Sequence, residues 1–287
     1  MQDEFSQPQE FLEECEALHA LLADRAASVF DLVTQFKSWT IGDVIAHLHL
    51  GNRLVLLALL DPDRFRETIR TFGGRTARAG SMREATRAQL GDLHGRALLE
   101  VWREESRALA ERFQQADPRA RVPWVGPDMS VRTSVTARSM ETWAHGQAVF
   151  DRLGVLRRDA DRIRSIAELG IRTFGWSHRV RGLEVPAPTP RIRLAAPSGG
   201  WWEWNEGVTS ELVEGVATEF CQVVTQTRAL ADTSLRVEGP IATRWMSTAQ
   251  CFAGPPEDPP RPGTRYLMAP GVEDDVTGAQ SAPGRLE

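Results

Sequence analysis

Residues 137–154 read ARSMETWAHGQAVFDRLG, and this stretch decides the fold of the first half of the chain. Its apolar residues recur at helical spacing and Gly154 suits the residue just past a helix, so we expect a helix from about Ser130 to Leu153. Glu141 and His145 are four residues apart and therefore lie on one face of that helix. This spacing allows a carboxylate and an imidazole to bind the same metal ion.

A second stretch, SWTIGDVIAHL at residues 38–48, predicts another helix of the same bundle. Thr40 suits the N-cap position, and Asp43 suits the positively polarised first turn. The pattern continues to about Leu60, where Asp-Pro-Asp ends it. His47 can supply a third metal ligand across the bundle core. His49 lies about 200° further round the helix, so His47 and His49 cannot both face that core.

Two histidines and one carboxylate leave a coordination position open, as in catalytic zinc sites. The spacing alone also fits a surface Glu–His ion pair and a histidine that is only part of the core. The apolar neighbours Trp143 and Val149 argue against a fully exposed helix. Arg138 precedes Glu141 by three residues on roughly the same face, and we expect a structural role for it.

The remaining pattern predicts an α+β protein with two domains and a tail. Further helices are expected at residues 9–33 and 82–115, with a loop at 72–81, which makes residues 1–155 a four-helix bundle. Beyond it, residues 156–255 form a small α+β domain. Its expected strands are 191–195, 201–204 and 235–237, and its expected helices are 160–174, 212–230 and 241–252. Residues 256–287 lack a core pattern and are predicted to be a disordered tail.

Composition limits the kinds of partner. The net charge of the 287 residues is −5 and the basic residues are scattered, which argues against a nucleic-acid partner. No apolar run approaches the length of about eighteen residues that a membrane span needs, and the acidic start does not fit a signal peptide. The cysteines, Cys15, Cys221 and Cys251, form no CxxC motif. We therefore expect reduced, buried thiols and a cytoplasmic protein without a membrane partner.

Both helical stretches, together with EFCQVVTQTRALADTSL (219–235) and AQCFAGPP (249–256), resemble the mycothiol-dependent maleylpyruvate isomerase family. That family belongs to the DinB-like superfamily of metal-binding four-helix bundles. Its pattern has a Trp-Thr pair at the start of helix two, a histidine seven to eight residues later, and Glu-x-x-x-His on helix four. The resemblance implies that His47, Glu141 and His145 bind a divalent metal, with zinc the first choice. One departure is QFKS before Trp39, where relatives usually carry a Pro-Gly turn.

The resemblance also implies a function. Family members use the metal to bind the thiol of mycothiol, which then attacks an electrophilic small molecule in an S-transfer or an isomerisation. Arg228 matches an arginine that the family uses near its active site, so it is a candidate catalytic and cofactor-binding residue that holds a carboxylate of the thiol or substrate. A solvated helix arginine is the alternative. Two other functions stay open: a thiol-independent metal-dependent lyase, hydrolase or cyclase, and a non-enzymatic protein that binds a small ligand.

Overall fold

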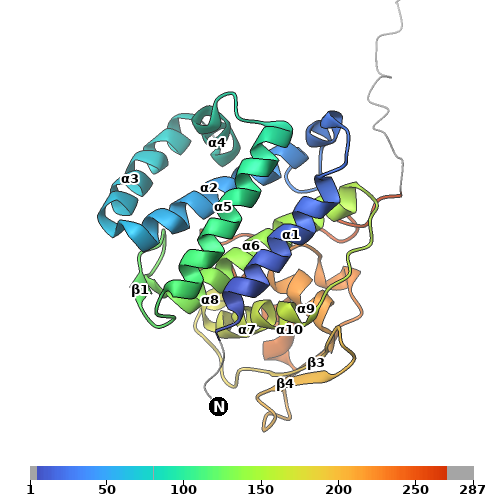
Figure 1. Ribbon diagram of the computed structural model, residues 1–287. Coiled ribbons are helices and arrows are strands. Elements are labelled where there is room, and N and C mark those ends of the chain that lie inside the picture. Colours follow the sequence, from blue (N-terminus) through green and yellow to red (C-terminus); the bar gives the residue numbers. More distant parts are fainter. Residues whose placement is uncertain (1–4, 80, 270–287) are drawn as a thin grey trace, which may run out of the picture.

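The computed structural model describes residues 5–79 and 81–269, and it confirms the predicted α+β class. Figure 1 shows the helices of the N-terminal half grouped together and the small sheet at the opposite end, with helices α7 to α10 between them. The core of the bundle consists of four helices: α1 (Gln7–Leu22), α2 (Ile41–Leu60), α5 (Gly95–Gln115) and α6 (Val131–Arg152). α1 and α2 each pack against both α5 and α6.

The first connections of the bundle differ from the prediction. A short 3-10 helix, Ala27–Asp31, follows α1. The predicted loop at 72–81 is wrong, because α3 (Pro62–Ala79) is helical through most of it. Pro62 ends α2, yet it stands at the first position of α3, where a proline needs no amide partner.

The long helix predicted at 82–115 is two helices, α4 (Met82–Leu90) and α5. The break between them falls at Gly91 and Gly95, whose φ angles are 56° and 57°. Both angles lie in the left-handed region, which glycine adopts at little cost and which the interior of a right-handed α-helix does not contain. The two glycines therefore turn the chain where the apolar pattern alone suggested continuity.

α2 is the one helix, among those in the described part of the chain, that is long and apolar enough to cross a membrane by length and composition. Within the most apolar 18-residue stretch of α2, 56% is buried inside the protein. Val44, Ile45 and Leu48 are fully buried in the bundle core. Packing within the bundle accounts for the apolar character of these residues.

The C-terminal half begins with a 3-10 turn, Asp161–Ile163, and the helices α7 (Arg164–Arg172) and α8 (Phe174–Arg179). A four-stranded sheet follows in the order β4-β3-β5-β6, in which β3 and β5 are parallel and the other neighbours antiparallel. Its strands are β3 (Arg191–Ala195), β4 (Trp201–Trp204), β5 (Leu212–Val216) and β6 (Arg236–Glu238). β3 and β4 match the predicted strands, and β6 lies within a residue of the third.

The helix predicted at 212–230 is wrong in its first part, which is strand β5. Gly215 lies in β5 with a φ of 155°, and a Cβ there would come within 2.7 Å of Leu235. Helix α9 (Ala217–Val224) follows, then a 3-10 turn, Leu230–Asp232. α10 (Pro240–Met246) ends well before the predicted Phe252. A two-stranded ribbon, β1 (Arg121–Val122) with β2 (Met129–Ser130), leads into α6.

Residues 256–269 contact the rest of the protein, although they fall in the predicted disordered tail. The backbone amide of Tyr266 donates to Gln35 Oε1 at 2.8 Å, and that of Met268 donates to the carbonyl of Asp151 at 3.0 Å. These contacts link the segment to the loop before α2 and to the end of α6. The rest of the predicted tail, 270–287, lies outside the described residues.

Helix α6 belongs to two hydrophobic cores. Val135 and Val149 are fully buried among the bundle helices. Met140 and Trp143 lie on another face of α6 and pack with α7, α9 and α10 in the C-terminal core. The residues between these faces therefore lie at the boundary between the two halves of the protein.

We predict that Thr40→Ala lowers the melting temperature by about 2–4 °C, because the N-cap of α2 contributes about 1 kcal/mol. The Thr40 hydroxyl accepts a bond from the Asp43 amide at 3.1 Å, and Asp43 in turn accepts one from the Thr40 amide at 2.9 Å. Thermal unfolding followed by circular dichroism measures the change. Thr40→Ser keeps the hydroxyl and is the control, so equal melting temperatures for the two variants would contradict the prediction.

Candidate metal centre

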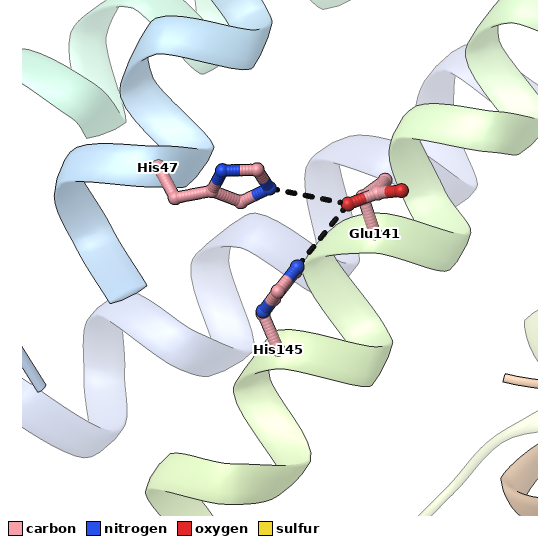
Figure 2. Close-up of side chains that lie close together, drawn as sticks. All are labelled: His47, Glu141 and His145. Carbon is pink, nitrogen blue, oxygen red and sulfur yellow. Dashed lines mark hydrogen bonds and ion pairs between the residues drawn. The ribbon is translucent and has the colours of Figure 1, made fainter. Parts of the chain in front are cut away.

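His47, Glu141 and His145 come together at the boundary between the two halves. Figure 2 shows His47 reaching from α2 towards Glu141 and His145, which project from successive turns of α6. Glu141 Oε2 lies 3.4 Å from His47 Nε2 and 3.3 Å from His145 Nε2. One donor atom from each residue lies within 4.8 Å of the others. The two helices thus bring the three predicted ligands to one point.

These separations suit a tetrahedral metal ion. With bonds of about 2.0–2.1 Å to nitrogen or oxygen, neighbouring ligand atoms of a tetrahedral zinc ion lie about 3.3–3.4 Å apart. Both distances to Glu141 Oε2 match this edge length. Three ligands on one side also leave a fourth position open, as catalytic zinc sites require. The donor set therefore fits a divalent ion such as zinc.

The protonation states also fit metal binding. Burial by itself would raise the pKa of the Glu141 carboxyl, but hydrogen bonds from His145 and His47 outweigh it and hold that pKa well below its ordinary value. Burial lowers the pKa of the His145 imidazole, and the nearby His47 lowers it further. An ionised carboxylate and a neutral imidazole are the forms that coordinate a metal.

Aromatic rings from the loop before α2 orient His145. The Phe36 ring meets the imidazole edge-on at 4.9 Å between centroids, and the Trp39 ring stacks on it at 5.9 Å. His145 Nδ1 has no hydrogen-bond partner within the described residues. The ring orientation that metal-bound histidines usually obtain from a second hydrogen bond is here set by packing.

The departure from the family pattern, QFKS, forms the tight turn that carries these rings. Lys37 and Ser38 have φ angles of 50° and 55°, a left-handed conformation that costs a non-glycine residue roughly 1–2 kcal/mol. The Thr34 amide donates to the Trp39 carbonyl at 2.8 Å and closes the turn. A glycine would relieve the strain, which is consistent with the Pro-Gly turn that the resemblance led us to expect at this position.

The other histidines lie outside the cluster. His49, the rival to His47, is buried on the far side of α2, where its Nδ1 lies 2.9 Å from Glu105 Oε2. His19 lies beside Glu100, and His178 is hydrogen-bonded to the Phe174 carbonyl. The sequence argument that His47 and His49 point in different directions is confirmed.

Arg228 lies in the turn after α9 instead of on the predicted helix. Its guanidinium holds the Asp151 carboxylate in a fork, with both N–O distances 2.7 Å. The two side chains are 11% and 4% exposed. The carboxylate that Arg228 holds therefore belongs to this protein, at the end of α6. Its role near a thiol or substrate stays a prediction.

Two cavities meet at the triad. The first cavity, of about 290 Å³, lies between the loop before α2, α6 and the C-terminal half. Apolar side chains form much of its wall, and we call it the polar cavity after the charged residues Lys37, Asp151, Glu257 and Arg265 that also line it. The apolar cavity, of about 480 Å³, lies on the other side and is walled mainly by α2, α6 and the β1–β2 connection. His47 and Glu141 line both. A ligand in either cavity therefore has access to the candidate metal site.

Sequence reasoning missed several residues of these cavities. Glu257 and Arg265 come from the segment taken for a disordered tail, where no apolar period marks structure. Arg138, expected to be structural, lines the apolar cavity. The sequence did contain a signal for Arg138: it is a charged residue on a largely buried helix face. A buried cation needs a partner, so such a residue indicates an interaction inside the protein.

Comparison with known proteins gives the family. The sequence profile of the mycothiol maleylpyruvate isomerase N-terminal domain matches residues 11–150, a range that contains all three members of the triad. The N-terminal half of the chain belongs to the mycothiol maleylpyruvate isomerase N-terminal domain family. Two relatives from Mycobacterium tuberculosis, "Uncharacterized protein MT0041" and "Uncharacterized protein Rv0036c", are each 37% identical to it over 243 residues. The alignment covers 85% of this chain and 93% of each relative.

Among solved structures, the chain is similar to the crystal structure of the mycothiol-dependent maleylpyruvate isomerase. The sequence identity is 15% and the TM-score is 0.49. The superposition covers 76% of this chain and 87% of the isomerase. A mutant of the same isomerase matches equally.

For this member of the mycothiol maleylpyruvate isomerase family, we predict about one zinc-like ion per chain after purification. His47→Ala, Glu141→Ala and His145→Ala should each remove it, because two remaining donors bind a metal too weakly to survive dialysis. Elemental analysis measures the content. His49→Ala is the matched control and should keep the ion, and full occupancy in all three triad variants would rule out this site.

We predict that Arg228→Met destabilises the protein by about 3–5 kcal/mol, because it leaves the Asp151 carboxylate buried without its cation. Adding Asp151→Asn should recover part of the loss, since it removes the unpaired charge. Urea unfolding measures both. Arg66→Met breaks an exposed ion pair with Asp63 and is the control, expected to change little. Additive losses in the double variant would contradict a coupled pair.

Proposed function

We propose that the protein is a cytoplasmic, metal-dependent enzyme that uses mycothiol as the nucleophile in an isomerisation of, or S-transfer to, an electrophilic small molecule. The observation that carries the proposal is the triad of His47, Glu141 and His145, which faces two cavities and, with three donors, would leave a bound ion a fourth position. Membership of the mycothiol maleylpyruvate isomerase family supports the choice of thiol.

The protein's own thiols do not suit a nucleophilic role. Cys15, Cys221 and Cys251 are all buried and free. Burial raises the pKa of the Cys15 thiol to about 12 and also raises the pKa values of Cys221 and Cys251. A thiol with such a pKa is protonated at neutral pH and reacts slowly. The reacting sulfur is therefore supplied by a separate small molecule.

The triad residues would hold a divalent ion, with zinc the first choice on the donor set. When bound, such an ion supplies the positive charge that lowers the pKa of a coordinated thiol. Trp39 and Phe36 keep the His145 ring in place and cover it from water. The Glu141 carboxylate stays ionised between its two histidines.

The polar cavity suits a small hydrophilic thiol. Arg265 lies over the Phe36 ring, 5.0 Å from its centroid, and lines this cavity together with His145. Lys37 forms an ion pair with Glu257 at 2.6 Å across the cavity wall. These groups offer donors and acceptors to hydroxyls, amides and a carboxylate. The Arg228–Asp151 pair fixes the end of α6 behind them.

The reaction that follows needs no further cofactor. Addition of the thiol sulfur to an activated carbon–carbon double bond forms a C–S bond and leaves a single bond that can rotate. Expulsion of the same sulfur restores the double bond in the other geometry. If the adduct is instead released, the result is S-transfer.

The decisive test is calorimetric titration of mycothiol into zinc-loaded protein and into protein stripped by a chelator. We expect binding to the loaded protein that weakens at least about tenfold after stripping, because the thiolate loses its ion. Glu141→Ala should behave like stripped protein, while His49→Ala should behave like wild type. Equal binding with and without zinc would refute thiolate coordination. No binding at all would favour the thiol-independent metal lyase or hydrolase.

A further inference from the structure

The apolar cavity has walls that exclude a strongly hydrated ligand. Large apolar side chains from four elements and the β1–β2 connection line it: Leu50, Leu54, Ile69, Trp124, Leu169 and Trp176. Its volume of about 480 Å³ falls within the range of about 300–1,000 Å³ that is typical of small-molecule sites. The occupant of this cavity therefore presents a mainly apolar surface.

One cation interrupts these apolar walls. Arg138 is 3% exposed, and its guanidinium donates to Asn52 Oδ1 at 3.1 Å and to the Leu48 carbonyl at 3.2 Å. Both acceptors are neutral. In the part of the chain that the structure describes, no carboxylate lies within 4.0 Å of this guanidinium, whereas the buried Arg157 contacts two and the buried Arg228 contacts one. Arg138 is thus a buried charge without a counter-ion at ion-pair distance.

Gly51 allows the guanidinium of Arg138 to lie at the cavity wall. The guanidinium of Arg138 lies against Gly51, where a Cβ would come within 2.6 Å of Arg138 Nη1. Both residues line the apolar cavity. Any other residue at position 51 would push the guanidinium away. The backbone of α2 is therefore shaped to hold a cation beside the triad.

The carboxylates near the cavity do not neutralise Arg138. Glu141 attracts it, but the Glu141 carboxylate is shared between His47 and His145. A divalent ion on the triad would draw that charge further away. Asp128 lines the cavity too, yet it is exposed to solvent. Burial lowers the pKa of Arg138, but a guanidinium stays protonated in proteins.

We propose that the apolar cavity binds the electrophilic substrate as an apolar monocarboxylic acid, whose carboxylate is held by Arg138 and whose apolar body lies between Leu54 and Trp176. This inference rests on the proposed function only in calling the bound acid a substrate, because binding of the acid requires neither a thiol nor turnover. Because Arg138 is the one arginine or lysine among the residues that line the apolar cavity, it can neutralise one carboxylate of a ligand. The triad beside it then meets the part of the acid nearest the carboxylate.

The test uses octanoate and its neutral analogue octanamide as probes, titrated calorimetrically into the zinc-loaded full-length protein without thiol. We expect octanoate to bind at least about tenfold more tightly, because a charge-assisted bond to a buried guanidinium exceeds a neutral one. Arg138→Gln should abolish this preference and leave octanamide binding within about twofold. Lys37→Ala, in the polar cavity, is the matched control and should preserve the preference.

Two further variants keep the test decisive. Glu141→Gln, which should lose the metal, is expected to retain the preference, so its disappearance there would show that the ion and not Arg138 holds the carboxylate. Leu54→Trp fills the cavity and should abolish binding of both probes even if Arg138→Gln fails to fold. Equal affinities in wild type, or a preference that survives Arg138→Gln, would overturn the proposal. Mycothiol binding is measured separately, so either hypothesis can fail alone.

Discussion

The structure depends on one helix that packs in two directions. α6 presents Val135 and Val149 to the bundle and Met140 and Trp143 to the C-terminal core. Many residues of such a helix are committed to packing, and the seam between the two faces remains available to polar side chains. Glu141 and His145 occupy that seam. The candidate metal site is therefore located by the same constraint that joins the two halves of the protein.

The seam also brings charges into a poorly hydrated region, and each charge is balanced in a different way. Arg157 contacts Glu14, with Asp159 3.3 Å from it, and Arg228 holds Asp151. These pairs fix the α1–α6 contact and the end of α6. The Glu141 carboxylate instead lies between the imidazoles of His47 and His145, the donor set of the candidate metal site. Arg138 alone among these four groups is left with neutral acceptors, which separates it from the residues that only join helices.

Local chemistry made the triad predictable. The Thr40 cap set the phase of α2, and the four-residue spacing set the phase of α6, so the directions of His47, Glu141 and His145 followed from helix geometry. Helix α3 was missed because an Asp-Pro pair that ends one helix can also begin another. Strand β5 was missed because LVEGV reads as well on a helix as on a strand, and only pairing with β3 and β6 decides between them.

Long-range contacts account for the remaining differences. Nothing local marks residues 256–269 as ordered, since their contacts are with Gln35, Gln226 and Asp151, which are distant in sequence. The two cavities could not be predicted from the sequence either, because each is the space left between elements from different parts of the chain. The sequence predicted which residues could bind a metal, and tertiary structure determined what surrounds them.

The place of Arg265 in the wall of the polar cavity has a consequence for the synthesis of the protein. All three candidate ligands leave the ribosome well before Arg265 and Glu257, which complete that cavity. Translation therefore separates metal binding from completion of the polar cavity. The three ligands are available to a metal ion while the cavity for a second small molecule is still incomplete. A nascent chain that stalls before Glu257 would carry the ligands without the enclosure that limits what can reach them.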